Sequence, residues 1–237
     1  MSKYLIFGAT GSIGTKLAEE LYKSNKEIHL IGRNKDELEL LSSKVNCDYT
    51  VLDILNENIS EFVKDEFKDI EVSGIAYCVG SIDLKPLKIS KKEDFQKCFD
   101  LNFFPVIDII KSLQENLKKN NGSIVLFSTV AVRKGFTNHA IISSTKGAIE
   151  GLTVSLAAEF APNIRVNCIA PTLTNSKMSQ NILKSKIMAE SIAKSHPMKR
   201  IGKPEDVASM AKFLLTSESS FITGQIISVD GGKSSLS

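Results

Sequence analysis

The chain has 237 residues and a formal net charge of +3, with 42% hydrophobic and 24% charged residues. This length and composition suit one α/β domain over residues 1–237 with a sizeable core, and no apolar run is long enough to span a bilayer. Lysine and arginine are scattered among aspartate and glutamate, so the charge pattern gives no support for nucleic acid or a membrane surface as a partner.

The first expected element is a buried strand at Lys3–Phe7, followed by a glycine-rich turn and a helix over Thr15–Lys23. Gly8, Gly11 and Gly14 punctuate the turn. Glycine lets the backbone approach a phosphate closely, and free amides at a helix N-terminus bind negative charge. The turn therefore predicts a dinucleotide pyrophosphate site, although an ordinary strand-to-helix turn is the alternative because the glycine spacing differs from the commoner one.

A second strand is expected at Glu27–Ile31, and the residues after it meet the adenosine ribose in such folds. An acidic residue there would repel a 2′-phosphate, whereas Arg33 offers a guanidinium, which favours NADP over NAD. The alternative is a solvated surface arginine. A third strand at Tyr49–Leu52 ends at Asp53, which either accepts a hydrogen bond from adenine or caps a helix expected over Asn56–Phe67.

The remaining pattern continues the alternation of strands and helices to the end of the chain. A further helix is expected over Asp36–Lys44, one or two helices over Lys91–Lys119, and others over His139–Phe160, Asn175–Ser195 and from Pro204; strands are expected at Gly74–Gly80, Ser123–Phe127, Arg165–Ile169 and Gln225–Gly232. Seven strands alternating with helices predict a doubly wound, Rossmann-type parallel sheet with helices on both faces, in three layers.

The four cysteines, Cys47, Cys78, Cys98 and Cys168, lie far apart and show no metal-ligand spacing. We expect them to be buried free thiols, with no metal site. The first apolar run is only about five residues and leads into glycines, which is not typical of a signal segment. Together these features predict a cytoplasmic protein.

In this order and spacing, the motifs resemble those of the short-chain dehydrogenase/reductase family from end to end. The segments that carry the resemblance are Gly8–Gly14, Val79–Gly80, Asn102, Ser128–Thr129, Ser143–Ala148, Ile164–Pro171, Arg200–Ala208, Ile222–Gln225 and Val229–Gly232. The resemblance implies a nicotinamide dinucleotide as cofactor. It places the cofactor contacts at Gly8, Thr10, Gly11, Ser12, Ile13, Gly14, Arg33, Asn34, Asp53, Ile54, Val79, Gly80, Lys146, Pro171, Thr172 and Leu173.

In that family a tyrosine gives its proton to the substrate carbonyl, and a lysine four residues later lowers the tyrosine pKa and binds the nicotinamide ribose. Lys146 matches this lysine, but the residue four positions earlier is Ile142, which cannot donate a proton. The family's serine falls at Thr129, or at the neighbouring Ser128 if the register differs by one. This chain therefore resembles a divergent member that lacks the usual tyrosine.

Other departures from the family pattern are Thr172 in place of the glycine after Pro171, Tyr77 and Cys78 in place of paired asparagines, and Ser12 in place of the middle glycine. His139 lies two helical turns before Lys146, a spacing that resembles the Tyr-x6-Lys pattern of enoyl-acyl-carrier-protein reductases. Histidine is a competent general acid near neutral pH. His139 is either a substitute acid or a polar residue at the helix entrance with no role.

The other candidates also have two interpretations. Lys146 binds the nicotinamide ribose or is a plain surface lysine. Asn102 has a role in a water relay or a helix kink, or it only packs. Tyr77 is a poorer acid candidate because it precedes the strand end, where we expect its side chain to face the core. We expect an NADP-dependent oxidoreductase (NAD being possible) acting on a small carbonyl, alcohol or activated double bond. The alternative is a catalytically silent NADP(H)-binding protein. The resemblance implies a homodimer or homotetramer, with the helices over Lys91–Lys119 and His139–Phe160 at the subunit interface.

Overall fold

The computed structural model describes residues 2–55 and 58–236. Its strands form a seven-stranded sheet in the order β3-β2-β1-β4-β5-β6-β7, and every neighbouring pair is parallel. The strands are β1 Lys3–Phe7, β2 Ile28–Gly32, β3 Asp48–Val51, β4 Val72–Tyr77, β5 Ser123–Phe127, β6 Arg165–Pro171 and β7 Ile226–Val229. The predicted doubly wound, Rossmann-type sheet is confirmed.

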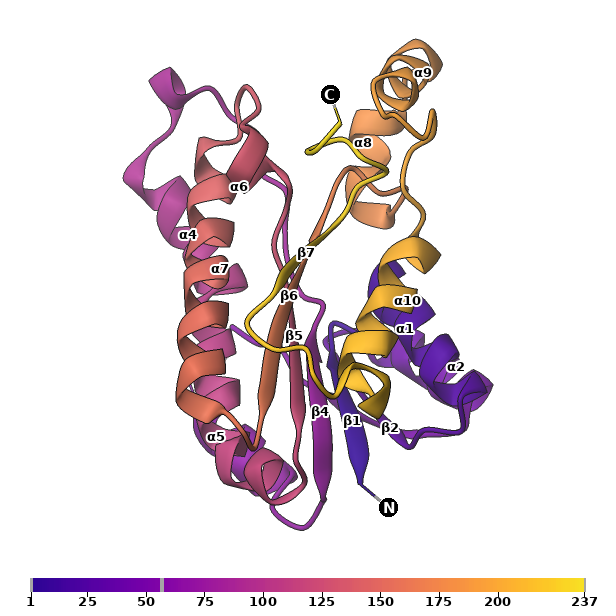
Figure 1. Cartoon of the computed structure of the whole chain (residues 1–237), viewed down its shortest axis with the longest axis vertical. Coiled ribbons are helices and arrows are strands. Elements are labelled where there is room, and N and C mark those ends of the chain that lie inside the picture. Colours follow the sequence, from indigo (N-terminus) through magenta and orange to yellow (C-terminus); the bar gives the residue numbers. More distant parts are fainter. Residues whose placement is uncertain (1, 56–57, 237) are drawn as a thin grey trace.

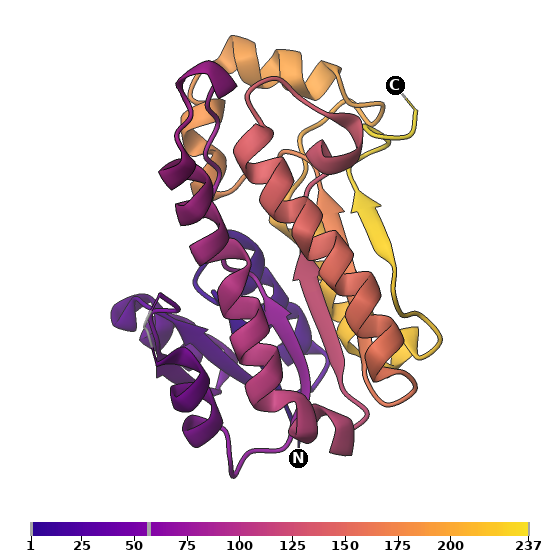
Figure 2. The same ribbon diagram turned by 90° about the vertical axis from the view of Figure 1, so that its left-hand side faces the viewer.

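Helices cover both faces of the sheet, which gives three layers (Figures 1 and 2). The helices are α1 Ser12–Lys23, α2 Lys35–Val45, α3 Ile59–Glu66, α4 Lys92–Asn102, α5 Phe104–Lys119, α6 Ala131–Lys134, α7 Ala140–Phe160, α8 Gln180–Leu183, α9 Lys186–Lys194 and α10 Pro204–Leu215. One layer holds α1, α2 and α10, and the other holds α4, α5 and α7. Within these layers α1 packs against α10, and α4 packs against α7.

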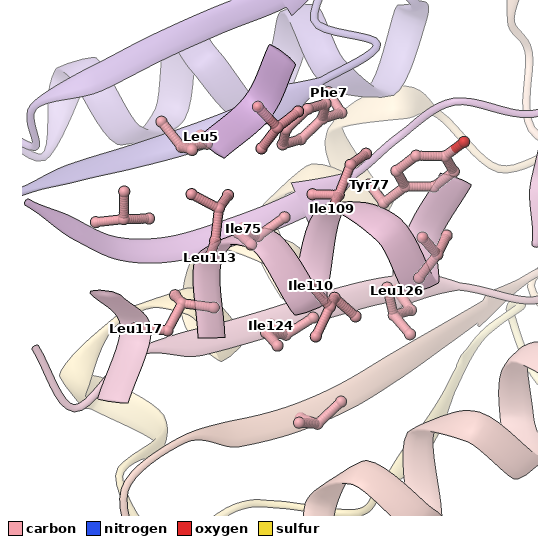
Figure 3. Packing of buried hydrophobic residues seen from close by; sticks show 14 of the residues in the cluster. Leu5, Phe7, Ile75, Tyr77, Ile109, Ile110, Leu113, Leu117, Ile124 and Leu126 are labelled. Carbon is pink, nitrogen blue, oxygen red and sulfur yellow. The ribbon is translucent and has the colours of Figure 1, made fainter. Parts of the chain in front are cut away.

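The strands are apolar on both sides because both faces of the sheet are covered. Leu5, Ile6 and Phe7 of β1 are fully buried, and their side chains alternate between the two layers. Figure 3 shows one of these interfaces, in which Ile109 and Leu113 of α5 lie against side chains of the central strands. This packing fixes the carboxyl ends of the central strands, where the site described below is built.

Several elements differ from their predicted bounds. The long helical stretch is two helices, broken at Phe103 (φ −126°, ψ −60°), directly after Asn102. The helix α3 begins at Ile59 with Asn58 as its N-cap, while residues 56 and 57 of the predicted helix lie outside the described residues. The strand β7 stops at Val229, because the backbone of Gly231 and Gly232 turns at positive φ.

The segment expected to form one helix between β6 and α10 instead contains the 3-10 turn Lys177–Ser179 and the helices α8 and α9. Figure 1 places α8 and α9 at the same end of the molecule as α6. Across residues 2–55 and 58–236, no helix is both long and apolar enough to cross a bilayer. The same residues contain no group of three histidine, cysteine or acidic side chains arranged to hold a metal.

Candidate active site

A cavity of about 600 Å³ opens at the carboxyl ends of β4, β5 and β6, beside the start of α1. This is where ligands bind in open α/β sheets. Many of the predicted site residues line it together: Gly11, Ser12, Ile13, Val79, Gly80, Ser128, Thr129, His139, Lys146, Pro171, Thr172 and Leu173. The fold thus gathers residues that are up to 162 positions apart into one site, between Gly11 and Leu173.

The glycine turn after β1 is shaped as a cradle for an anion. Gly8 has φ +77°, and a Cβ there would lie 2.9 Å from Cγ2 of Val79. A Cβ on Gly14 would lie 2.4 Å from the carbonyl oxygen of Gly8, so only glycine allows α1 to pack this closely against the turn. Gly11 is the N-cap of α1, and no described side chain caps the helix, which leaves its first amides open to the cavity side. These residues fit a pyrophosphate.

A second, smaller hollow lies beside the carboxyl ends of β2 and β3, and it is lined by Arg33, Asn34, Lys35, Asp36, Val51 and Asp53. It brings together the residues predicted to meet the adenosine. Asn34 is the N-cap of α2, since its side chain accepts a hydrogen bond from the Glu37 amide at 3.2 Å. The carboxylate of Asp53 accepts from the Leu55 amide at 3.1 Å, and it does not cap α3.

Four of the predicted cofactor contacts, all of them described residues, line neither the cavity nor the smaller hollow. Gly8, Thr10 and Gly14 form the back of the glycine turn, where Thr10 hydrogen-bonds to Glu37. Ile54 is buried in the hydrophobic core, 7% exposed, so its side chain faces away from both hollows. Burial of the Ile54 side chain stabilises the hydrophobic core instead.

Lys146 lies inside α7 with 8% of its surface exposed, and its ammonium group faces the loop after β4. A Cβ on Gly80 would lie 3.7 Å from Lys146 Nζ and 3.0 Å from the Asn102 side-chain oxygen, so Gly80 leaves room for both. Burial lowers the pKa of Lys146 to about 8, and the sulfurs of Cys168, Cys98 and Cys78 partly oppose this shift. The interpretation of Lys146 as a plain surface lysine is therefore wrong.

Asn102 is fully buried at the end of α4. Its side-chain amide donates to the Cys98 carbonyl at 2.9 Å and to Ser81 Oγ at 3.3 Å, and its oxygen accepts from the Ser81 amide at 3.4 Å. Asn102 therefore ties the helix break at Phe103 to the loop after β4, which carries Gly80. It does not itself line the cavity.

Ile142 lies one helical turn before Lys146 and lines the same cavity, although it is only 5% exposed. At the end of β5, Ser128 donates to Glu150 of α7 at 2.7 Å and is buried, whereas Thr129 is half-exposed. Thr129 Oγ1 accepts from the Ala131 amide at 3.3 Å, so its proton is available to a ligand. Of the two hydroxyls, Thr129 is the better placed to polarise a carbonyl.

His139 is the N-cap residue of α7 and lines the cavity as predicted. Its ring is tilted against Phe136, and its Nδ1 lies 2.8 Å from the Thr137 carbonyl oxygen. Tyr77 points into the core, where its hydroxyl donates to the Leu101 carbonyl at 2.7 Å and burial raises its pKa. Tyr77 is therefore excluded as the missing acid.

Most of the cavity's far wall was not predicted from the sequence. The wall includes the apolar side chains of Ile82, Leu84, Phe136, Met178, Ile182 and Ile192, together with His196 and Lys177. The backbone amide of Lys177 donates to Ser12 Oγ at 3.0 Å, and its ammonium group lies 2.8 Å from Glu37. The His196-Pro197 pair, which ends the polar segment, was the one feature of the sequence that could have pointed to this wall.

Comparison with known proteins gives the same family along nearly the whole chain. Residues 8–234 match the family described as enoyl-(acyl carrier protein) reductase. A tropinone reductase homolog of Arabidopsis thaliana is 34% identical over 240 residues, which cover 96% of this chain and 90% of the relative. A 3-oxoacyl-(acyl-carrier-protein) reductase of Rickettsia bellii is 31% identical over 234 residues, covering 96% and 95%.

Solved structures agree with these relatives. A short-chain type dehydrogenase/reductase from Mycobacterium ulcerans superposes with a TM-score of 0.91 at 28% identity, covering 98% of this chain and 90% of that one. The protein ElxO, solved with NADP bound, superposes with a TM-score of 0.90 at 28% identity and 98% coverage of both chains. The chain therefore belongs to the short-chain dehydrogenase/reductase family of NAD(P)-dependent oxidoreductases.

Proposed function

We propose that the chain is an NADP-dependent oxidoreductase that transfers hydride between the nicotinamide and a small carbonyl, alcohol or activated double bond. One observation carries this proposal: the glycine cradle, Lys146 and Thr129 border a single cavity. ElxO, which resembles this chain in fold and sequence, was solved with NADP, which supports the cofactor. When bound, the nicotinamide supplies or accepts the hydride.

Each part of the site has one task in this proposal. The amides of Gly11, Ser12 and Ile13 hold the pyrophosphate, and the loop residues Val79 and Gly80 lie against the cofactor. Arg33 binds the 2′-phosphate, Asn34 and Asp53 border the adenosine, and Lys146 binds the nicotinamide ribose. Pro171, Thr172 and Leu173 border the nicotinamide. Thr129 orients the substrate oxygen, and Asn102 holds the loop of Gly80.

The mostly apolar far wall, with Ile82, Leu84 and Met178, favours a substrate whose body is apolar. Because Ile142 cannot give a proton, the reduced product takes its proton from His139 or from a relay to solvent. A hydroxyl at Thr129 lowers the energy of the developing oxyanion in either case.

The second candidate function is a catalytically silent NADP(H)-binding protein, and Ile142 is the observation that favours it. The two functions are separated by measuring NADPH binding by fluorescence and NADPH oxidation across a panel of carbonyl and enoyl compounds. Oxidation with at least one apolar substrate supports the enzyme. Tight NADPH binding without oxidation of any compound contradicts it.

The cytoplasm is the proposed location, and a homodimer or homotetramer is the proposed assembly. The assembly is supported by apolar side chains on the outer faces of α5 and α7, where Phe104 is 45% and Val154 is 50% exposed. The rings of Phe99 and Phe103 pack against Phe104 and extend this patch. Sedimentation at micromolar concentration tests the assembly, and a monomer would contradict it.

A further inference from the structure

A threonine and a histidine form a hydrogen-bonded pair in the wall of the cavity. Thr172 Oγ1 lies 3.0 Å from His196 Nε2, and the other ring nitrogen, Nδ1, lies 2.8 Å from the carbonyl oxygen of Ile192. His196 is 2% exposed, and both residues line the cavity. A buried imidazole held at both nitrogens beside a reactive cavity is arranged for more than packing.

The partners of His196 determine where its protons lie. The Ile192 carbonyl can only accept, so Nδ1 carries a hydrogen in both the neutral and the charged ring. In the neutral ring Nε2 is then an acceptor, and Thr172 donates to it. In the imidazolium form Nε2–H donates to Thr172 Oγ1 instead, which frees the threonine proton to point into the cavity. Both forms of the ring are therefore fully hydrogen-bonded.

Thr172 lies beside Thr129 at the ends of two neighbouring strands. The parallel ladder pairs Phe127 of β5 with Ile169 of β6, and the Val130 amide extends it with a 3.1 Å bond to the Pro171 carbonyl. Thr129 therefore lies opposite Pro171, one residue before Thr172. Neighbouring strands are about 4.8 Å apart, and both threonines line the cavity.

From this geometry we infer that Thr172 is a catalytic residue that passes a proton from His196 to the substrate oxygen. The inference rests on the proposed reductase function and names the residues through which the proton reaches the substrate. As hydride reaches the carbonyl carbon, the C=O π electrons move to the oxygen, which takes the Thr172 proton. The Thr172 oxygen takes the Nε2 proton of the His196 imidazolium, which becomes neutral. In the oxidative direction each proton moves the opposite way.

Charged groups lie around His196. Burial alone would raise the pKa of Asp230, but hydrogen bonds from Ser234 and Gly232, together with His196, hold it below its usual value. Asp230 is therefore a carboxylate in the surroundings of His196. Two lysines lie in the same surroundings: the Lys233 ammonium donates to the Ser195 carbonyl at 3.0 Å, and the Lys199 ammonium donates to the Lys194 carbonyl at 3.1 Å.

Two departures of this chain from the family pattern then complement each other. Ile142 removes a hydroxyl from one wall of the cavity, and Thr172 adds one where the pattern has glycine. The acid is displaced from α7 to the end of β6, and His196 acts on the substrate only through Thr172.

The test compares Thr172→Val, Thr172→Ser and His196→Gln with the parent, and Thr174→Val serves as a matched control. Thr174 Oγ1 donates to the Thr172 carbonyl and has no histidine partner within residues 2–55 and 58–236. We expect Thr172→Val to lower kcat about 100-fold with KM little changed. Thr172→Ser should restore kcat to within about threefold, and His196→Gln should remove the imidazole step from the pH profile of kcat.

A second readout does not need turnover. The ¹⁵N spectrum of His196 should show the Nδ1–H tautomer at high pH, with an Nε2 shift that changes in Thr172→Val. A neutral Nε2–H tautomer overturns the relay, as does an unchanged kcat in Thr172→Val or a loss that Thr172→Ser does not restore. If the spectrum is as expected but no substrate is turned over, the proposed function itself is wrong and the relay with it.

Discussion

The backbone amide of Lys177 donates a 3.0 Å hydrogen bond to Ser12 Oγ, although the two residues are 165 positions apart. The bond ties the segment after β6 to the glycine cradle. The ammonium group of the same lysine pairs with Glu37 at 2.8 Å, and Glu37 also bonds Thr10. Lys177 therefore bridges the entrance between the cradle and α2.

Removing this bridge should speed cofactor entry. Exposed ion pairs are weak, so we expect Lys177→Met to raise the association rate of NADPH about two- to fivefold, measured by stopped-flow fluorescence. Glu37→Gln should act in the same direction, because it breaks the same pair. Lys184→Met, an exposed lysine at the end of α8, is the control. A slower association in Lys177→Met would show that the ammonium group guides the cofactor instead.

A phenol at position 142 should take over the supply of the proton. In the Thr172→Val background, Ile142→Tyr places a hydroxyl one turn before Lys146, whose cation favours its ionisation. We expect kcat for a carbonyl substrate to rise at least about tenfold over Thr172→Val alone. Ile142→Phe in that background matches the size without the hydroxyl. Equal effects of tyrosine and phenylalanine would mean that shape, and not the proton, limits the reaction.

Arg33 should determine the choice between NADP and NAD. Replacing it with aspartate puts a carboxylate in the smaller hollow, where it repels a 2′-phosphate and can accept from a ribose hydroxyl. The NADP-to-NAD affinity ratio should fall at least about tenfold in Arg33→Asp. Lys118→Asp, at an exposed position of α5, controls for the change in net charge. An unchanged ratio would rule out Arg33 as the 2′-phosphate ligand.

Lys146 should lower the free energy of unfolding of the cofactor-free protein, although the same residue binds the nicotinamide ribose when the cofactor is present. Its pKa falls from 10.5 to about 8 in the folded state, so the charged form is disfavoured there by about 3 kcal/mol. The full destabilisation holds below pH 8 and disappears as the pH rises towards 10.5. Lys146→Met should therefore raise the free energy of unfolding at pH 7 by up to about 3 kcal/mol.

The same variant should bind NADPH more weakly, because the ribose loses its cation. Urea unfolding at pH 7 and pH 10 and a fluorescence titration measure the two effects. Lys118→Met is the exposed control. If Lys146→Met is less stable than the parent at pH 7, burial of the Lys146 ammonium group does not destabilise the folded protein.

His29 should make the fold sensitive to acid. It is 5% exposed, its Nε2 lies 2.7 Å from Thr50 Oγ1, and its Nδ1 has no partner in the described chain. Burial lowers its pKa from 6.5 to about 4, so between these values the unfolded chain binds a proton that the folded one does not. Stability should therefore fall by up to about 3 kcal/mol as the pH drops from 6.5 to 4.

Urea titrations at pH 7 and pH 4.5 test this expectation. The loss between the two pH values should be smaller in His29→Gln, which cannot titrate. An identical loss in His29→Gln and the parent would assign the acid sensitivity to other groups.

The sequence predicted the sheet because its strands are short apolar runs whose burial on both faces leaves a continuous pattern. It also predicted the cradle, since the glycines are required by close backbone approach at Gly8 and Gly14. The sequence did not predict whether the helical stretch breaks at Phe103, because the apolar stripe continues through this position. Only the contact of Asn102 with the Ser81 loop reveals why the backbone turns there.

The far wall was not predictable, because its residues have no shared periodicity. Met178, Ile182 and Ile192 lie on three short helical pieces whose directions are set by tertiary contacts. The pairing of Thr172 with His196 joins residues 24 positions apart across two loops. No local pattern marks such a pair, since each residue alone is typical of a turn.

The segment from Lys177 to His196 contacts the cradle through Lys177 and forms part of the apolar wall with Met178, Ile182 and Ile192. We expect a cofactor that enters the cradle to rearrange the contact at Ser12, and the wall is attached to that contact. Substrate should therefore find its finished pocket only after the cofactor is seated, which produces a compulsory order of addition. Substitutions in this wall leave the strands of the sheet unchanged. One short segment can therefore change the substrate preference while the residues that support hydride transfer stay the same.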